Sequence, residues 1–179
     1  RVAGQDWPGL ARQRLTLCAV SGRRVVAPLV PLFRDKNPHT ELRLRLSDHL
    51  LDLVKESVDV ALRIGGLRDS SLTQKKVVAA RRVICASPTY LEEMGTPLRP
   101  QDLLNHQCLV LRFPGSVQYR WTLGKDADQV TIPVSGKIDA DDGDILTEWA
   151  IKGFGLVMKP LFEVAREVAR SEERRVGKE

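Results

Sequence analysis

The chain has 179 residues, of which 42% are hydrophobic and 28% charged, so it holds enough apolar material for one ordinary domain or two small lobes. Its net charge of +5 comes from 28 basic and 23 acidic residues that are scattered among one another, which argues against the concentrated basic face of a typical nucleic-acid binder. No run approaches the roughly 18 apolar residues that span a bilayer, and no basic start is followed by the apolar run of a secretory signal.

The two ends of the chain differ from its middle. Residues 1–13 lack hydrophobic periodicity and are predicted to be a linker remnant or foreign sequence. Because the chain opens on Arg1, we expect that the native start is missing. The last ten residues, RSEERRVGKE, carry seven charges and no apolar stripe, and they resemble the translation of a sequencing adapter. We therefore expect residues 170–179 to be a non-native tail outside the fold.

The first organised segment is a short apolar strand predicted at Leu15–Val20. The segment VVAPLVPLF follows, and its Pro28 and Pro31 lack the N–H that a helix interior uses. A helix that begins near Ala27 places Pro28 in its first turn, where proline is tolerated. Asn37 then ends this helix before the next proline, and Pro31 stays unfavourable on propensity alone.

The clearest pattern is Glu41–Ser47, where leucines alternate with arginines at the period of two that a half-buried strand requires. A short amphipathic helix is predicted over HLLDLVKES, with Asp48 as its N-cap. Asp59–Gly65 is almost continuously apolar, as in a parallel strand that is covered on both faces. The order strand, helix, strand predicts a right-handed βαβ unit and therefore an α/β sheet.

The second half also alternates strands with helices. An extended run over 75–87 ends in the apolar VICAS, and a helix follows at 88–94 with Ser87 as N-cap and proline at the first helical position. Further predicted elements are a short helix at 100–105, strands at 108–113, 120–124, 129–137 and 155–160, and a final helix at 161–168. No linker composition separates the halves, which meet near Ser87, so the predicted lobes are residues 14–86 and 87–169.

The best helix of the second half is predicted at Asp141–Phe154. Its apolar face consists of Ile145, Leu146, Trp149 and Ala150. The acidic run DADD at 139–142 precedes it, and this run fits two interpretations. Clustered carboxylates attract hard cations, but carboxylates directly before a helix also cap its free N–H groups and favour its positive dipole end. The run lacks the spacing of a calcium loop, so we favour capping.

The chain shows none of the residue constellations that carry common enzyme chemistry. Cys18, Cys85 and Cys108 lie far apart within apolar runs and are predicted to be buried, reduced thiols of a cytoplasmic protein. Neither the cysteines nor the three histidines have metal-ligand spacing. The sequence also contains no nucleophile elbow, phosphate loop or dinucleotide fingerprint. It therefore predicts no metal, no cofactor and no catalytic residues.

Small and polar residues recur where a predicted strand gives way to the next segment. These junctions are Ser21-Gly22, Gly65-Gly66, Ser87-Pro88 and Asp142-Gly143. In an open α/β sheet the carboxyl ends of the strands face one crevice, and free helix N–H groups favour an anionic ligand. Serine and glycine also favour caps and turns for purely structural reasons, but four such junctions together predict a small-molecule site.

Two basic residues occupy apolar strands. Arg63 lies one residue before Ile64-Gly65, and Lys159 ends the apolar segment GLVM. A buried cation must be paired, because an uncompensated buried charge is costly. Each side chain therefore either binds a ligand carboxylate or pairs with an acid of the protein, which for Arg63 includes Asp59.

Several segments, read in series over residues 14–169, resemble a known family. They are APLVPLF before a helix that ends at a proline, SDHLLDLV, DVALRIG, VICASPTYL followed by GTP and DLLNH, IPVSGKIDADDGD, and AIKGFGLVMKP. This series resembles the effector-binding domain of LysR-type transcriptional regulators. The resemblance implies a periplasmic-binding-protein-like (type 2) fold of two Rossmann-like lobes, with a small-molecule effector, such as an organic acid, in the cleft between them.

The resemblance also implies site residues and partners. Carried over by position, the effector contacts are Ser21, Arg63, Ile64, Gly65, Ser87, Asp142 and Lys159. The strand around Arg43 and Arg45, with the preceding helix, is implied to form the interface of a homodimer or tetramer. DNA contact is implied only through an N-terminal helix-turn-helix that this chain lacks. The chain also ends before the family's segment that returns to the first lobe, so we expect an incomplete C-terminus.

Two other classes of function compete with a cytoplasmic regulator. A periplasmic solute-binding protein of a transporter shares the fold, but it requires a signal peptide upstream. A small α/β enzyme is disfavoured because the sequence lacks its nucleophile, metal and phosphate-loop motifs.

Overall fold

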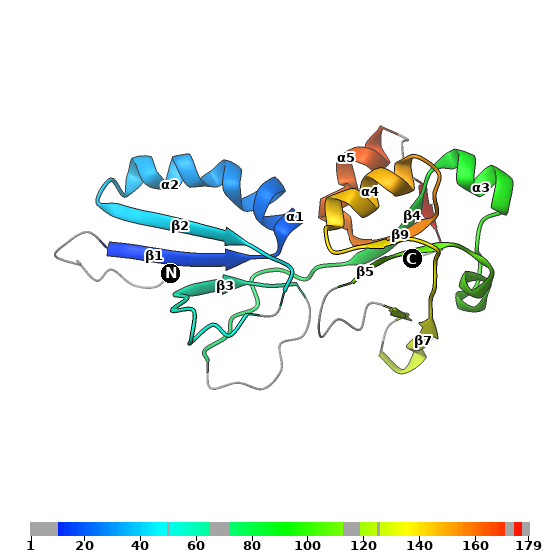
Figure 1. Cartoon of the computed structure of the whole chain (residues 1–179), viewed down its shortest axis with the longest axis horizontal. Helices are drawn as coiled ribbons and strands as arrows, with labels where there is room; N and C mark the ends of the chain where they lie inside the picture. The colour runs from blue at the N-terminus through cyan, green and yellow to red at the C-terminus, as the bar shows by residue number, and fades with distance from the viewer. Residues whose placement is uncertain are drawn as a thin grey trace. The chain divides into compact units, whose positions relative to one another are not determined.

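The computed structural model describes residues 11–49, 51–64, 72–112, 119–124, 126–170 and 174–176. The chain divides into two compact units, residues 1–68 (unit 1) and residues 69–179 (unit 2). Each unit combines a sheet with helices, as the sequence predicts for an α/β protein (Figure 1). The division falls earlier than the predicted boundary after residue 86, because β4 (Arg82–Ala86) pairs with β9 (Leu156–Pro160) and therefore belongs to unit 2.

Unit 1 is built on a three-stranded parallel sheet in the order β2-β1-β3. Its strands are β1 (Ala11–Leu17), β2 (Thr40–Leu46) and β3 (Val60–Leu62). The predicted strand at 41–47 is confirmed, and β3 is parallel as predicted. However, Val60 and Leu62 are exposed, so the expectation that this strand is covered on both faces is wrong.

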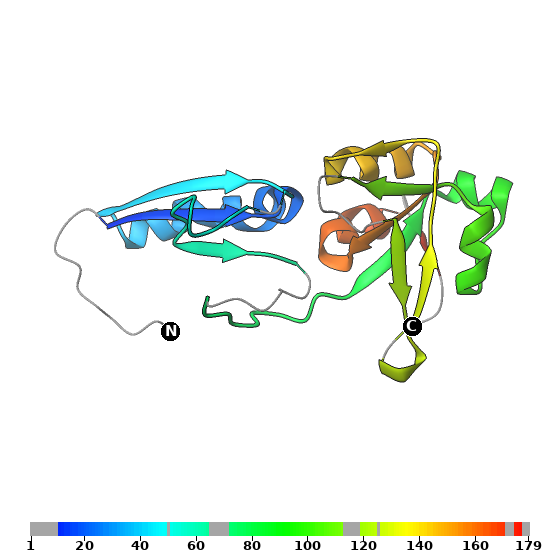
Figure 2. The ribbon, with the colours of Figure 1, turned by 60° about the horizontal axis from the view of Figure 1, so that its bottom comes forward.

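Helical backbone runs without a break from the end of β1 to Lys36. It consists of α1 (Ala19–Ser21), a π-helical turn (Gly22–Val26), a 3-10 turn (Ala27–Leu29) and α2 (Val30–Lys36). The helix thus begins eight residues before the predicted start. Pro28 lies in the 3-10 turn and Pro31 in the first turn of α2, so the change of winding accommodates both missing N–H groups. The segment packs on one face of the sheet, where Gly22 meets Leu17 and Leu46 (Figures 1 and 2).

The structure corrects both ends of the first predicted strand and the helix predicted after β2. β1 begins at Ala11, so residues 11–13 belong to the fold, and it ends at Leu17, before the predicted end at Val20. The helix predicted after β2 is absent from described residues 51–57, of which residues 53–57 form turns. There, Asp52 Oδ1 accepts hydrogen bonds from Val54 N and Lys55 N, and Ser57 has a φ of 51°, which ends a single turn.

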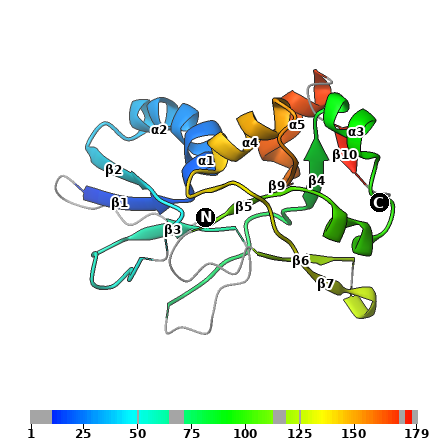
Figure 3. The ribbon, with the colours of Figure 1, turned by 45° about the vertical axis from the view of Figure 1, so that its right-hand side comes forward.

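Unit 2 contains a five-stranded sheet in the order β10-β4-β9-β5-β8. β4 is antiparallel to both its neighbours, whereas β5 is parallel to β9 and β8. A separate hairpin pairs β6 (Arg120–Leu123) with β7 (Val130–Pro133). The remaining elements are β5 (Cys108–Leu111), β8 (Asp139–Ala140), β10 (Arg174–Val176), α3 (Pro88–Met94), a 3-10 helix η3 (Pro100–Asn105), a 3-10 turn (Asp126–Asp128), α4 (Gly143–Ile151) and α5 (Leu161–Ala169) (Figure 3).

The core of unit 2 consists of two clusters of buried side chains. The first includes Tyr90, Leu103, Trp121, Ile132 and Leu156. The second includes Val83, Leu109, Leu146, Val157 and Val164. Consecutive residues of β9 join different clusters because side chains alternate along a strand. The predicted apolar face of α4 is confirmed at Leu146 and Ala150, which are buried, but Ile145 is exposed.

The C-terminal segment contributes a strand. Residues 174–176 form β10, which pairs with β4, so the expectation that residues 170–179 stay outside the fold does not hold for these three residues. The foreign origin of the segment stays a prediction. Cys85 and Cys108 are buried reduced thiols as predicted, whereas Cys18 is only half-buried. Within the described part of the chain, no helix combines the length and hydropathy that crossing a bilayer requires.

Candidate functional site

The three parallel strands of unit 1 end at one edge of the sheet. Leu17 is in register with Leu46 and Leu62, the last residues of the neighbouring strands. Ser47 and Arg63 are the next residues after β2 and β3, and α1 begins two residues after β1. The structure therefore gathers Ser21, Arg63 and Ile64 at this carboxyl edge, as the order of strands predicts. Gly65 lies outside the described residues.

Arg63 is held at this edge by two neutral oxygens. One Nη donates to the backbone carbonyl of Ser47, and the other donates to Thr16 Oγ1 at 3.1 Å. The predicted protein partner, Asp59, precedes β3 and accepts from Arg14 N at 2.7 Å at the opposite end of the strand. Among the residues that the structure describes, Arg63 forms no ion pair with a carboxylate. Its positive charge is thus fixed in direction without being neutralised by a described acid.

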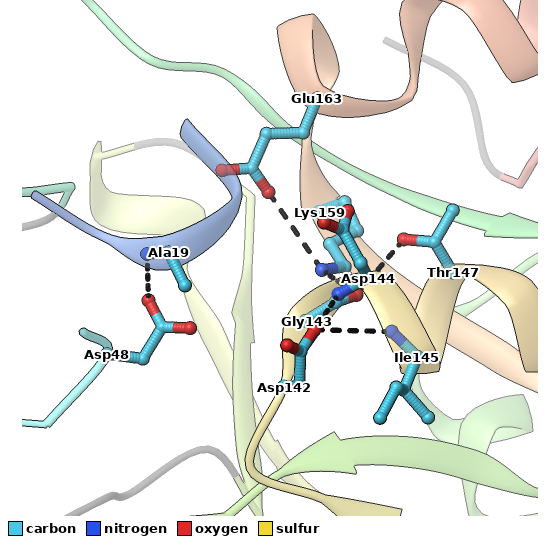
Figure 4. A network of polar contacts seen from close by, with 9 residues as sticks. All are labelled: Ala19, Asp48, Asp142, Gly143, Asp144, Ile145, Thr147, Lys159 and Glu163. Atoms are coloured by element: carbon cyan, nitrogen blue, oxygen red, sulfur yellow. Dashed lines mark hydrogen bonds and ion pairs between the residues drawn. The ribbon is translucent and has the colours of Figure 1, made fainter. Parts of the chain in front are cut away.

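Asp48, which the sequence predicts to be a helix N-cap, lies at the same edge and has a different role. Asp48 does not cap a following helix; its Oδ1 accepts from the backbone N–H of Ala19 at 3.0 Å (Figure 4). It therefore ties the loop after β2 to the helical turn after β1. The useful sequence signal is the position of Asp48 two residues beyond β2, because the ends of neighbouring parallel strands lie side by side.

The carboxyl edge of β5, β8 and β9 in unit 2 carries the N-terminus of α4. Asp142 is its N-cap, and its Oδ1 accepts from Asp144 N at 2.7 Å and Ile145 N at 3.4 Å. The capping interpretation of the acidic run is therefore confirmed for Asp142. Among the described residues, no three His, Cys, Asp or Glu side chains are grouped as a metal site would need.

Lys159 lies beneath the first turn of α4. Its side chain is buried, and Nζ donates to the carbonyl of Gly143 at 2.6 Å and lies 3.9 Å from Glu163 Oε2 (Figure 4). The same carbonyl accepts from Thr147 Oγ1 at 3.2 Å. Of the two predicted roles, this geometry favours pairing within the protein over a direct effector contact.

The structure does not bring Ser87 together with Asp142 and Lys159. Ser87 follows β4 and caps α3, where its Oγ accepts from Tyr90 N at 3.2 Å, as predicted. Because β4 is antiparallel to β9, Lys159 lies opposite Val83 at the start of β4, and Ser87 lies beyond the other end of the strand. The site prediction assumed that all strands end at one edge, and the reversed β4 breaks that assumption.

A buried polar chain in unit 2 was missed from the sequence. Tyr90 Oη accepts from Gln107 N at 3.0 Å and lies 3.1 Å from His106 Nδ1. The direction of the Tyr90–His106 hydrogen bond depends on which ring nitrogen of His106 carries the proton. Burial lowers the pKa of His106, an effect that the nearby Asp102 carboxylate opposes. This chain ties α3 to the start of β5.

The predicted interface arginines are exposed on β2, at one edge of the unit 1 sheet. Arg43 Nε lies 2.9 Å from Glu41 Oε1, and Arg45 Nη1 lies 2.6 Å from Glu56 Oε2. Hydrogen bonds from Arg12 and then Arg43 lower the pKa of Glu41.

Comparison with known proteins gives a consistent result. The family model described as the LysR substrate binding domain matches residues 8–177. The HTH-type transcriptional regulator DmlR of Escherichia coli (strain K12) is 32% identical over 148 residues, which are 83% of this chain and 48% of DmlR. The HTH-type transcriptional regulator CrgA of Neisseria meningitidis serogroup B is 35% identical over 145 residues, 81% of this chain and 48% of CrgA.

Solved structures of CrgA from Neisseria meningitidis superpose on the same fold. The structure of CrgA gives a TM-score of 0.79 at 31% identity, covering 94% of this chain and 56% of that one. The structure of the CrgA regulatory domain gives a TM-score of 0.78 at 31% identity, covering 94% and 81%. The type 2 periplasmic-binding-protein-like fold predicted from the resemblance is thereby confirmed.

The chain spans about half the length of these curated relatives. The relatives are regulators of transcription, so the alternative of a solute-binding protein of a transporter is not favoured. With a family model that matches nearly its whole length, the chain belongs to the LysR substrate-binding domain family.

Proposed function

We propose that this chain is the effector-sensing part of a cytoplasmic bacterial transcription regulator, and that it binds a small organic acid rather than catalysing a reaction. DNA binding would belong to a helix-turn-helix segment elsewhere in the regulator. The family membership supports this proposal, together with relatives named as HTH-type regulators. The predicted effector contacts remain part of the proposal, with Arg63 as the first candidate.

The observation that carries the proposal is the state of Arg63. Its guanidinium lies at the carboxyl edge of a parallel sheet, is partly buried, and is oriented by Ser47 and Thr16. A guanidinium has five N–H donors and matches a carboxylate in two parallel hydrogen bonds. Because no described acid neutralises it, a carboxylate of the effector is the ligand that this charge suits best.

In unit 2, Asp142 is the better effector contact of the two edge residues. It is half-buried, and its Oδ1 is engaged in capping, while no donor to Oδ2 is found among the described residues. An effector hydroxyl or ammonium could donate to that oxygen. Lys159 instead supports the turn from beneath.

The test is a thermal-shift screen of small mono- and dicarboxylic acids on the folded chain, followed by the variant Arg63→Met. A ligand at 100 times its Kd stabilises the folded state by about 2.7 kcal/mol. We expect at least one acid to raise the Tm and Arg63→Met to abolish that rise. Arg12→Met is the matched control, because Arg12 is exposed on β1 at the other end of the same sheet. A folded chain that no acid stabilises contradicts the proposal.

A second part of the proposal concerns self-association through β2 and the helix before it, the surface of Arg43 and Arg45. Leu29, Leu32 and Phe33 are exposed at a spacing that places them next to one another on a helix. β2 is also an edge strand of the sheet that the described residues form, and an edge strand pairs readily with another strand. A second copy of the chain would cover both features.

Analytical ultracentrifugation tests this surface. Leu32→Glu is expected to shift the chain toward monomer, because it places a charge in the apolar row. Leu98→Glu is the control, since Leu98 is an exposed leucine of unit 2. The surface is rejected if both variants associate as the unchanged chain does.

A further inference from the structure

We infer that Thr16 is a positioning residue, whose hydroxyl orients the guanidinium of Arg63 toward an anionic effector. The inference rests on the proposed function of Arg63 and names a residue that the sequence analysis did not single out. Its geometric basis is the contact between Arg63 Nη2 and Thr16 Oγ1 at 3.1 Å.

The strand register places these two groups on one face of the sheet. Thr16 pairs with Ala61, and Arg63 is two residues further along the chain, so the alternation of side chains directs Thr16 and Arg63 to the same face. Leu17 and Leu46 point to the other face, where the helical segment packs on them. Thr16 is thus a hydroxyl within the central strand, on the face away from that helical segment.

The burial of Thr16 indicates that its hydroxyl is retained for the hydrogen bond with Arg63. The side chain is completely buried, and a buried hydroxyl is retained only at a cost unless it has a hydrogen-bond partner. Arg63 is the partner that the structure gives it. Valine has nearly the same shape and no hydroxyl to desolvate, so packing alone would favour valine at this position.

The two contacts of Arg63 fix the plane of its guanidinium. Ser47 provides a backbone carbonyl, which substitution cannot remove, and Thr16 provides a side-chain acceptor. Together they use two of the five N–H donors, each on a different Nη, and leave three for a ligand. Without Thr16, one contact remains, and the plane can rotate about it.

The experiment compares Thr16→Val, which removes the hydroxyl at nearly constant shape, with Thr16→Ser, which keeps the hydroxyl and removes the methyl group. Two measurements are made by NMR on the whole chain: the rate of rotation of the Arg63 guanidinium and the dissociation constant for acetate, the smallest practical carboxylate probe. Arg63→Lys, which keeps the charge without the fork, reports on the proposed function itself.

We expect Thr16→Val to speed guanidinium rotation and to weaken acetate binding by roughly five- to tenfold, since hydrogen bonds to charged groups are among the stronger ones. Thr16→Ser is expected to keep both values within about twofold of the unchanged chain. If the role of Thr16 is purely structural, Thr16→Ser should change the rotation rate and the acetate affinity more than Thr16→Val does, because serine loses a buried methyl group that valine retains. Thr16→Ala repeats the loss of the hydroxyl should the valine variant not fold.

Other outcomes separate the two claims. If Arg63→Lys abolishes the acetate response while Thr16→Val leaves rotation and affinity unchanged, the proposed function stands and the role of Thr16 is overturned. That role is equally overturned if Thr16→Ser is as harmful as Thr16→Val. If acetate perturbs Arg63 in none of the proteins, the anionic effector is rejected and the inference falls with it.

Discussion

The two units of the chain bury their hydrophobic residues very differently. Unit 2 has two clusters of buried side chains, centred on residues such as Leu156 and Leu109. Among the described residues of unit 1, the buried hydrophobic side chains are Leu17 and Val20, whereas Leu32 is 59% exposed. Since burial of apolar area is the main source of folding free energy, unit 2 carries most of its own stability and unit 1 little.

The polar contacts show the same contrast. Unit 1 is tied by contacts across its strand ends, such as Asp48 to Ala19 and Arg63 to Thr16. Its ion pairs Arg12–Glu41 and Arg45–Glu56 are largely exposed. Unit 2 buries the pair Lys159–Glu163. Such a difference suits an effector-binding domain, because a ligand changes the folded population most where the intrinsic stability is small.

The largest effect is expected from Lys159→Met. This change removes the cation that lies 3.9 Å from the buried Glu163, and loss of one partner of a buried pair typically costs about 3–5 kcal/mol. Urea unfolding monitored through Trp121, which is buried in unit 2, measures it. The double variant Lys159→Met with Glu163→Leu should recover most of the loss, since two apolar groups can replace a buried pair. Equal destabilisation in single and double variants would show that the Gly143 contact, rather than the charge, matters.

The second prediction compares a leucine in each unit. Leu156→Ala in unit 2 removes a completely buried side chain and should cost about 3 kcal/mol. Leu32→Ala in unit 1 removes an exposed side chain and should change the free energy of unfolding of the monomer by no more than about 0.5 kcal/mol. Urea unfolding at a concentration that keeps the chain monomeric measures both. Similar losses at the two positions would mean that the two units do not differ in burial in solution.

The parts of this fold that the sequence predicts are those governed by local patterns. The alternation in Glu41–Ser47 locates β2 to within a residue, and Ser87 with Pro88 locates the start of α3. Such local signals need no knowledge of the rest of the chain. β3 is recognisable from its apolar run for the same reason, but it ends at Leu62, so Arg63 follows the strand instead of occupying it.

The features of the fold and the site that the sequence does not predict depend on long-range pairing. The direction of β4 is set by its neighbours β9 and β10, and reversing it removes Ser87 from the edge where Asp142 lies. The helical turns through Pro28 and Pro31 depend on a change of winding from π to 3-10 to α, which propensity alone does not predict. The sequence does not predict the role of Thr16 either, since its partner Arg63 is 47 positions away in the chain.

The third prediction concerns the pH dependence of unit 2. The folded-state pKa of His106 is lowered below its usual 6.5, so the unfolded chain takes up the proton first as the pH falls. The stability linked to His106 is therefore complete above about pH 6.5 and is lost as the pH falls from there through the folded-state pKa. Urea unfolding at pH 7.5, 6.5 and 5.5 should show this decline through Trp121 fluorescence.

The variant His106→Gln should flatten that decline, because it has no imidazole to protonate. His39→Gln and His49→Gln are the controls, since both of these histidines are exposed. If the free energy of unfolding still declines with falling pH in His106→Gln, and this decline disappears in either control, the pH dependence belongs to unit 1 instead.

The smallest effect is expected from Arg45→Met in unit 1. The Arg45–Glu56 pair has a short N–O distance of 2.6 Å, but its side chains are 55% and 43% exposed, so water competes for both partners. Exposed pairs contribute about 0.2–1 kcal/mol, and salt screens them further. We expect a loss of no more than about 0.5 kcal/mol at low salt that vanishes in about 0.5 M NaCl, measured by urea unfolding of the monomer. A loss above about 1 kcal/mol that survives the salt would mean that this pair is shielded from water within the monomer and stabilises unit 1 more than an exposed pair does.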